Sequence, residues 1–261
     1  MIYVCSDIHG CANRFYKLLK EIDFKDSDHL YILGDIIDRN PDGVELLKYV
    51  MDKPNITLLM GNHEHFMYSY LVRLNVLGKL DIKDNFPSDI WLSSNNGGMV
   101  TLNSFAEESL AVKNDILKYL STLPVIILLT VNGRKYHLSH AGTFANVLDK
   151  DVWYVSDFPK HILEDVVWSC PYRADTYICS LEYPDDCISI MGHVPVQKLY
   201  SNFSDFPGIF RRPDKDYAIL HDDGIVNIDS GCAMRHIESN WGVETALSCI
   251  CLNNLKEYYV K

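Results

Sequence analysis

The sequence contains no long hydrophobic run and no excess of basic residues. Its longest uninterrupted apolar stretch, residues 125–129, is far too short for a helix that crosses a bilayer, so we expect no membrane-spanning helix. Lysine and arginine number 24 against 35 aspartate and glutamate residues, for a net charge of −11. This balance argues against a general nucleic-acid binder, and we expect no binding to nucleic-acid duplexes. It is compatible with an anionic substrate, because bound divalent cations reverse the local potential.

The chain also lacks the features of a secretory signal. Met1 leads directly into a strand-like segment, residues 2–5, without a basic region or an extended apolar core. Its eight cysteines are spread through the sequence, and without a secretory signal this favours reduced thiols over a disulfide framework. We therefore expect a cytoplasmic protein. The composition does not indicate an oligomeric state.

The first third of the chain alternates between short apolar segments and helical patterns. The predicted strands are 2–5, 30–33 and 56–60, and the predicted helices are 11–22, 44–51 and 66–77. Repeated units of this kind predict parallel strands joined by helices.

After Pro124 the pattern changes to β-structure. Residues 125–131 and 134–139 flank Asn132-Gly133, which is a strong hairpin signal. Further strands are predicted at 188–191 and in the pairs 217–220 with 225–228 and 246–252 with 255–260. We predict one α/β domain over residues 1–261, with a helical excursion at 79–122 and a mostly antiparallel second half, built as a two-sheet sandwich with helices outside.

Five of the predicted strands each end in a small residue followed by potential metal or phosphate ligands. These ligands are Asp7 and His9; Asp35, Asp38 and Arg39; Asn62 and His63; His140; and His193. The carboxyl ends of strands in such sheets collect ligands, so we expect the five clusters to converge on one rim. Imidazole, carboxylate and amide oxygen together suit first-row metals. Each cluster alone has a structural explanation, such as a helix cap at Asn62, but their joint occurrence in order favours a metal site.

The chain resembles the calcineurin-like metallophosphoesterases, especially the bacterial and phage-type serine/threonine phosphatases of the phosphoprotein phosphatase branch. The motifs that carry the resemblance are Asp7-x-His9, Gly34-Asp35-x-x-Asp38-Arg39, Gly61-Asn62-His63-Glu64, His140, Gly192-His193 and Asn227-Ile228-Asp229-Ser230-Gly231-Cys232. The symmetrical diadenosine tetraphosphatases are near neighbours of that branch. The resemblance implies a central β-sandwich of two mixed sheets flanked by α-helices.

The resemblance also implies a dinuclear metal site. One ion would be held by Asp7, His9 and Asp35, and the second by Asp35, Asn62, His140 and His193. Mn²⁺ is favoured, with Fe or Zn as alternatives. In the family, a hydroxide held by the two ions attacks phosphorus directly, so no phosphoenzyme is expected.

The remaining motif residues are implied to act on the substrate. His63 would be the general acid, oriented by Asp38, while Arg39, Asn62 and Arg173 would bind the phosphate. Three positions depart from the family pattern: Asn40 replaces a glycine, Val194 replaces a threonine, and Cys170 stands where an arginine is usual. We considered Arg173 as a substitute for that arginine.

Three functions are compatible with these residues. The first is a metal-dependent phosphomonoesterase, a protein serine/threonine phosphatase acting on phosphoproteins or small phosphate esters; Asp38 favours it, because the tetraphosphatases tend to have another residue there. The alternative is a hydrolase of dinucleoside polyphosphates of the diadenosine tetraphosphate type, or of another nucleotide. A non-catalytic phosphate-binding module is the third, and the complete ligand set argues against it.

Overall fold

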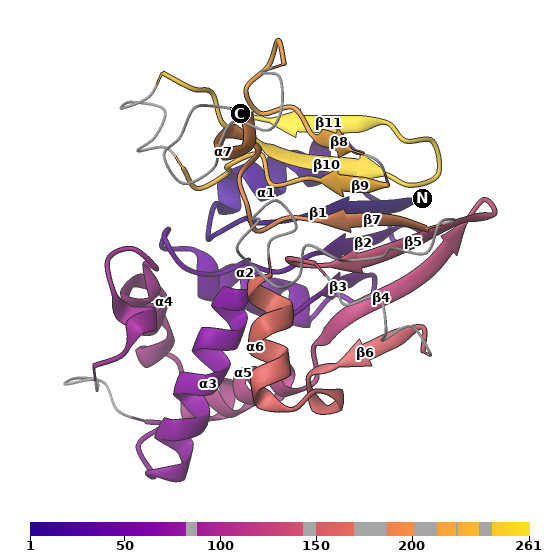
Figure 1. Cartoon of the computed structure of the whole chain (residues 1–261). Helices are drawn as coiled ribbons and strands as arrows, with labels where there is room; N and C mark the ends of the chain where they lie inside the picture. The colour runs from indigo at the N-terminus through magenta and orange to yellow at the C-terminus, as the bar shows by residue number, and fades with distance from the viewer. Residues whose placement is uncertain (82–87, 143–149, 170–186, 201–212, 223, 235–241) are drawn as a thin grey trace.

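The computed structural model in Figure 1 packs two β-sheets face to face, with helices against the outer face of the first. It describes residues 1–81, 88–142, 150–169, 187–200, 213–222, 224–234 and 242–261. Within these ranges no helix is both long and apolar enough to cross a membrane. None of the six cysteines in the described ranges forms a disulfide, as the sequence predicted, and all six are buried.

The first sheet contains five strands. In spatial order they are β11 (Glu257–Val260), β10 (Leu247–Cys251), β1 (Ile2–Cys5), β2 (His29–Ile32) and β3 (Ile56–Leu58). β1, β2 and β3 are parallel, whereas β10 pairs antiparallel with both β1 and β11.

The second sheet contains six strands and is mixed. In spatial order they are β6 (Val152–Tyr154), β4 (Pro124–Val131), β5 (Arg134–Ser139), β7 (Cys187–Met191), β9 (Ile225–Asn227) and β8 (Leu220–Asp222). Its central strands β5, β7 and β9 run parallel, and the outer pairs are antiparallel. The predicted sandwich of two mixed sheets is therefore confirmed, with more parallel pairing in the second half than the hairpins indicated.

Strand periodicity divides the apolar residues between two cores. Val4 of β1 packs toward the second sheet, against residues such as Leu138 and Ile190, and forms the core between the sheets. Its neighbours Tyr3 and Cys5 point to the opposite face, where they join the core under the helices. Successive side chains of a strand face opposite sides, so a strand buried on both faces reads as a continuous apolar run.

Helices cover the outer face of the first sheet and extend beyond it. They are α1 (Ala12–Glu21), α2 (Gly43–Met51), α3 (Asn62–Val76), α4 (Gly98–Ala106), α5 (Leu110–Ser121) and α6 (Lys160–Trp168), with 3-10 turns η1 (Ile90–Leu92) and η3 (Val155–Asp157). The short α7 (Val196–Tyr200) packs instead against residues of β7 and β8 in the second sheet. α3 packs against α5 and α6, and α4 lies beside α2.

Most predicted elements are present with shifted ends. The hairpin turn at Asn132 and Gly133 has positive φ at both residues, as its sequence requires. α3 begins at Asn62, four residues before the predicted start, and the strand expected at 217–220 lies at 220–222. α4 and α5 lie within the helical excursion predicted at 79–122, whereas β6, α6 and α7 were not predicted.

The carboxyl ends of the strands are held together by backbone contacts. The amide of Asp7 donates to the carbonyl of Gly34 at 3.2 Å, and that of Gly192 to His140 at 2.8 Å. Gly34 has φ of +97°, and a Cβ there would lie 2.5 Å from the Cα of Gly61. Glycine at position 34 thus serves both the backbone conformation and the close approach of β2 to the start of α3.

This close approach predicts a large difference between two glycine substitutions. Gly133 also has positive φ, but a Cβ there would meet nothing within 4 Å. Gly133→Ala should cost only the left-handed backbone penalty, about 1–2 kcal/mol. Gly34→Ala adds a backbone clash and should cost about 3–5 kcal/mol. Urea denaturation of both variants measures the difference, and equal losses would contradict the contact.

Candidate metal centre

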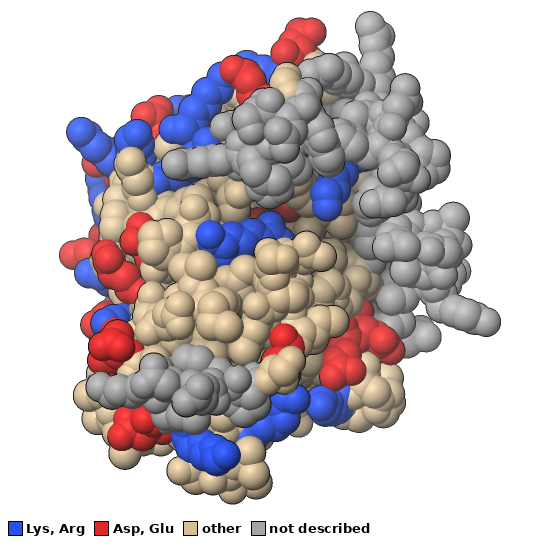
Figure 2. All heavy atoms as spheres, turned by 90° about the vertical axis from the view of Figure 1, so that its left-hand side faces the viewer, with Lys and Arg blue, Asp and Glu red and all other residues tan. Residues whose placement is uncertain are grey.

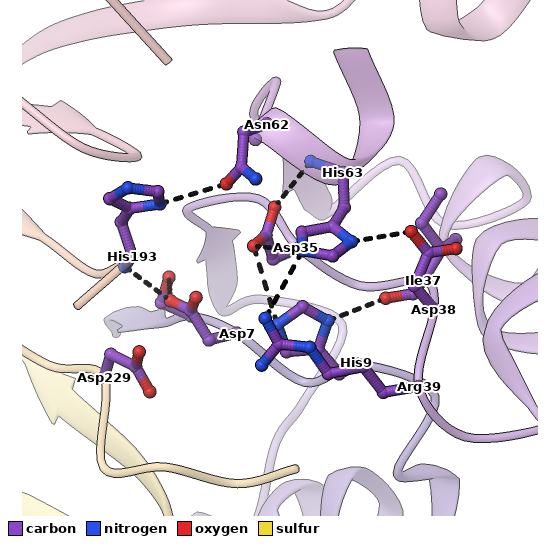
Figure 3. Close-up of polar contacts among 12 residues, drawn as sticks. Asp7, His9, Asp35, Ile37, Asp38, Arg39, Asn62, His63, His193 and Asp229 are labelled. Atoms are coloured by element: carbon purple, nitrogen blue, oxygen red, sulfur yellow. Dashed lines mark hydrogen bonds and ion pairs between the residues drawn. The ribbon is translucent and has the colours of Figure 1, made fainter. Parts of the chain in front are cut away.

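The ends of five strands bring nitrogen and oxygen ligands together around Asp35 (Figure 3). The potential ligand atoms form two groups, and within each group all of them lie within 4.8 Å of one another. His9, Asp35 and His63 form one group, and Asp35, His140 and His193 form the other. Asp35 belongs to both. All of these residues are buried except His193, which is half-buried. One carboxylate shared by two such ligand groups is the arrangement expected of a pair of cations.

The backbone at this rim is strained. Nine described residues other than glycine have positive φ, and six of them are Asp7, His9, Asp35, Asp38, Arg39 and His193. Such conformations are costly for most residues and persist only where surrounding contacts hold them. Their concentration at the strand ends marks this rim as the functional site.

The second ligand group brings hydrogen-bond acceptors face to face. His140 Nδ1 donates to the carbonyl of Leu33 at 2.8 Å, so a neutral ring carries its lone pair on Nε2. That Nε2 lies 2.8 Å from Asn62 Oδ1 and 3.2 Å from His193 Nδ1. His193 Nδ1 in turn lies 3.0 Å from Asn62 Oδ1. His140 Nε2 and Asn62 Oδ1 are both acceptors and cannot hydrogen-bond to each other, so a cation between them would explain their approach. The backbone contact of His140 is also typical of a metal ligand.

The first ligand group shows the same arrangement. His9 Nδ1 donates to the carbonyl of Ile37 at 2.9 Å, which leaves Nε2 facing Asp35 Oδ2 at 3.5 Å. Asp7 lies in the same cavity but in neither compact group; its Oδ2 accepts from Ser6 Oγ at 2.5 Å and from the His193 amide at 3.0 Å. The structure therefore brings His9 and Asp35 together directly and places Asp7 alongside them, nearer to His193 (Figure 3).

Burial sets the protonation of the histidines. It lowers the pKa of His9 and His140 below the usual value, and lowers the pKa of His193 to about 3. A neutral imidazole is the form that binds metal.

The carboxylates respond in opposite ways. Burial raises the pKa of Asp7 well above its usual value, with further contributions from Asp229 and Asp35. Burial also acts to raise the pKa of Asp35, but the histidines that face it lower the pKa more, so that it lies below the usual value. His140 makes the largest of these contributions. Asp7, Asp35 and Asp229 are thus three buried carboxylates close together. Such a group of negative charges fits a site that binds cations. Both ligand groups are therefore suited to divalent ions.

His63 has a separate set of contacts. Its Nδ1 lies 2.6 Å from Asp38 Oδ2, which also accepts a hydrogen bond from Trp91 Nε1 at 2.7 Å. All three side chains are at most 2% exposed. Burial opposes protonation of His63, but Asp35 and Asp38 outweigh it and raise the pKa of the imidazole. The predicted pairing of His63 with Asp38 is present, although His63 Nε2 also lies 3.8 Å from Asp35 Oδ2, within the first ligand group.

Arg39 lies over this site, whereas Arg173 cannot be placed. Arg39 Nη2 is 3.4 Å from His63 Nε2, and its amide donates to the carbonyl of Gly97 at 3.4 Å. Arg173 and Cys170 both lie outside the described residues. That Arg173 substitutes for the arginine usual at position 170 therefore stays a prediction.

Comparison with known proteins agrees with this geometry. The profile of the calcineurin-like phosphoesterase family matches residues 1–226 of the 261-residue chain. The chain belongs to this family. Calcineurin-like phosphoesterases use a dinuclear divalent metal site, and the two ligand groups that share Asp35 supply residues for such a site.

Curated relatives with similar sequences carry the name of a dinucleotide hydrolase. The chain is similar to the symmetrical bis(5'-nucleosyl)-tetraphosphatase of Buchnera aphidicola subsp. Acyrthosiphon pisum (strain Tuc7), with 42% identity over 64 residues, 24% of this chain and 23% of that protein. The matched part thus spans only about a quarter of the curated relative's length.

Two solved structures share the fold with this chain. A crystal structure of a candidate diadenosine tetraphosphatase has a TM-score of 0.56 at 16% identity, over 99% of this chain and 92% of that one. A protein serine/threonine phosphatase from Saccharomyces cerevisiae has a TM-score of 0.52 at 12% identity, over 100% of this chain and 79% of that one. At such identities the likeness shows the fold and does not separate the two activities.

Some contacts of this calcineurin-like site were not predicted from the sequence. Glu64 is fully buried and accepts hydrogen bonds from the amides of Asp35, Ile36, Ile37 and Gly61 at 2.6, 3.0, 3.4 and 3.1 Å. The four donors hold the strained turn after β2 against the start of α3. In the sequence, the only signal for Glu64 was its place in the motif Gly61-Asn62-His63-Glu64.

Trp91 and Asp229 are two further residues that the site analysis by sequence missed. Trp91 lies in the predicted excursion, with no pattern that links it to Asp38. Asp229 is 3% exposed; burial raises its pKa to about 6, while Arg39 acts to lower it. Its place in the late Asn-Ile-Asp segment was the available signal.

The contacts of Glu64 predict a large effect of a nearly isosteric change. Glu64→Gln replaces one acceptor oxygen by a donor amide that faces backbone N–H groups, so we expect a loss of about 2–4 kcal/mol in the free energy of unfolding. Chemical denaturation measures this loss. The control is Glu21→Gln at an exposed position. A change within about 0.5 kcal/mol for Glu64→Gln would contradict the role of these hydrogen bonds.

Proposed function

We propose that this protein is a metal-dependent hydrolase of dinucleoside polyphosphates that cleaves a tetraphosphate chain into two nucleoside diphosphates. The observation that carries the phosphohydrolase chemistry is the Asp35 carboxylate shared by two ligand groups. The substrate class is supported by the similarity to a symmetrical bis(5'-nucleosyl)-tetraphosphatase. This reverses the order of preference that the sequence analysis reached, which put protein phosphatase first.

The proposed ligands divide between two ions. Asp7, His9 and Asp35 would hold one, and Asp35, Asn62, His140 and His193 the other. When bound, two divalent cations supply an activated water near neutral pH and neutralise charge on the phosphoryl oxygens. Mn²⁺ is the proposed metal, with Fe or Zn as alternatives, because imidazole and carboxylate ligands suit these ions.

The protein's own side chains bind the phosphate and move a proton. Arg39 carries a planar guanidinium suited to two phosphoryl oxygens, and it lies against the Nε2 of His63. We propose that His63 Nε2 holds the proton that the departing oxygen receives. Asp38 fixes the ring by its contact with Nδ1, and Trp91 holds the carboxylate of Asp38.

A second function is favoured by that same buried network. A serine or threonine alkoxide is a much stronger base than the terminal oxygen of a nucleoside diphosphate, so its departure depends more on a proton donor. The buried contacts that position His63 are therefore suited to a phosphomonoester. Hydrolysis of phosphoserine or phosphothreonine in proteins is the alternative proposal.

One assay separates these proposals. Purified protein with Mn²⁺, or with a chelator, is given diadenosine tetraphosphate, a phosphothreonine peptide and an aryl phosphate, and the products are separated by chromatography. We expect two ADP from each dinucleotide, abolished by chelator, with kcat/KM about tenfold or more above that for the peptide. Faster phosphate release from the peptide would promote the alternative. If no product is released from any of the three substrates in a metal-dependent way, both proposed hydrolase functions are wrong.

Removal of the proton donor should affect substrates unequally. His63→Asn should lower kcat by about 10²–10⁴ for the phosphothreonine peptide and less for an aryl phosphate with a weakly basic leaving group. Steady-state kinetics give these values, and metal analysis should show unchanged metal content. His161→Asn, at an exposed position of α6, is the control. Loss of metal from His63→Asn would instead identify His63 as a ligand.

A further inference from the structure

A cleft of about 660 Å³ opens beside the metal centre, between the loop that precedes α4 and the segment around α7. Arg39 and His193 line it, so the cleft is continuous with the residues described above. Ser93, Ser94 and Asn95 lie along one side, and Lys198 of α7 along the other. A cleft of this size can hold several phosphate groups in a row.

The charge of this cleft is opposite to that of the protein. The chain has a net charge of −11, yet the described residues that line the cleft include two cations, Arg39 and Lys198, and no aspartate or glutamate. Figure 2, which views the side of the molecule that carries α3 and α4, shows basic side chains near the middle of a largely uncharged face. Cations that share a cleft repel each other, and an anion bound between them relieves that repulsion.

The position of Lys198 is fixed by its neighbours in α7. Val196 and Leu199 are fully buried, and the Val196 amide donates to the carbonyl of Asp229 at 2.9 Å. The side-chain Nε2 of Gln197 donates to the carbonyl of Ser230 at 2.9 Å. These anchors hold α7 against the Asp229 segment and leave the half-buried Lys198 on the side of the cleft. Lys198 also lies near enough to Asp229 to interact with its charge, as does Arg39.

We propose that this cleft binds the phosphate groups beyond the one under attack, and that Lys198 is a specificity-determining residue that contacts them. Serine hydroxyls and the Asn95 amide supply further donors for phosphate oxygens. The inference rests on the proposed function, because a dinucleoside polyphosphate presents several phosphates in a row and an aryl monophosphate only one. It also gives the site a second cation for phosphate without the arginine that is missing at Cys170.

The first test is kinetic. Lys198→Gln should lower kcat/KM for diadenosine tetraphosphate about tenfold to hundredfold, mainly through KM, because one charge-assisted contact to the substrate is lost. Hydrolysis of an aryl monophosphate should change less than about twofold. Lys198→Arg should restore most of the activity on the dinucleotide. Lys20→Gln, at an exposed position of α1, is the matched control. Equal losses on both substrates would overturn the proposal.

The second test needs no turnover. Titration calorimetry of inorganic tripolyphosphate and of orthophosphate, in the same Mn²⁺ buffer, compares the wild type with Lys198→Gln. We expect tripolyphosphate to bind about tenfold more weakly to the variant and orthophosphate equally to both. The heat of Mn²⁺ chelation by tripolyphosphate is measured in a blank titration without protein and subtracted, and free Mn²⁺ is kept in excess over tripolyphosphate throughout. Unchanged tripolyphosphate binding would refute the subsite. Weakened binding without dinucleotide hydrolysis would keep the subsite and refute the proposed substrate.

A phosphopeptide with acidic flanking residues is the other anion that such a cleft could accept. Hydrolysis of phosphothreonine peptides with and without aspartate beside the phosphothreonine, by wild type and Lys198→Gln, tests whether the cleft binds such a peptide. If Lys198→Gln affects only the acidic peptide and leaves tripolyphosphate binding unchanged, the cleft recognises protein, and the polyphosphate proposal is wrong.

Discussion

The structure depends on keeping the Asp35 carboxylate charged in a site that water hardly reaches. Asp35 is 2% exposed, and transfer of a carboxylate from water to such a place is strongly unfavourable unless positive charge or hydrogen bonds compensate it. His140, His63 and His9 face it from three directions and lower its pKa. Its Oδ1 also accepts a hydrogen bond from the His63 amide at 3.1 Å. Divalent ions between these groups complete the compensation that histidines alone provide only when protonated.

The surrounding backbone is built to hold that carboxylate in place. Left-handed conformations at Asp7, His9 and Asp35 turn their side chains into one cavity, at a conformational cost that neighbouring contacts offset. Glu64 contributes by accepting four amide donors from both sides of the turn. Gly192 contributes differently, because a Cβ there would lie 2.1 Å from Asp7 Oδ2. The strained backbone conformations are thus stabilised by the hydrogen bonds of Glu64, and the glycine at position 192 leaves room for Asp7.

Substrate choice is decided outside the metal ligands. The fold does not separate the two substrate classes, because it occurs in structures described as a protein serine/threonine phosphatase and as a candidate diadenosine tetraphosphatase. Two features of this chain bear on the choice. The His63 network with Asp38 and Trp91 suits a basic leaving group, whereas the basic cleft that contains Lys198 suits a chain of phosphates. These two features support the two functions proposed above, the first the phosphomonoester and the second the dinucleotide.

Part of the fold and site was accessible from local patterns. Strands followed by a small residue and then by Asp7, Asp35 or His140 could be recognised because strand periodicity and side-chain chemistry are properties of short segments. The start of α3 at Asn62 was missed, since its apolar periodicity begins only at Phe66 and tertiary contacts of Glu64 stabilise the first turn. The parallel pairing of β5 with β7 was also missed, because hairpin signals report only on neighbours in sequence.

The sequence by itself determined which chemical groups are present and that they follow buried strands, since both depend on residue identity over a few positions. Tertiary structure decided which of them meet. Trp91 reaches Asp38 across 53 residues, and Lys198 shares a cleft with Arg39 although 159 residues separate them. Contacts of this kind depend on how whole elements pack, and packing distances leave no periodic signal along the chain.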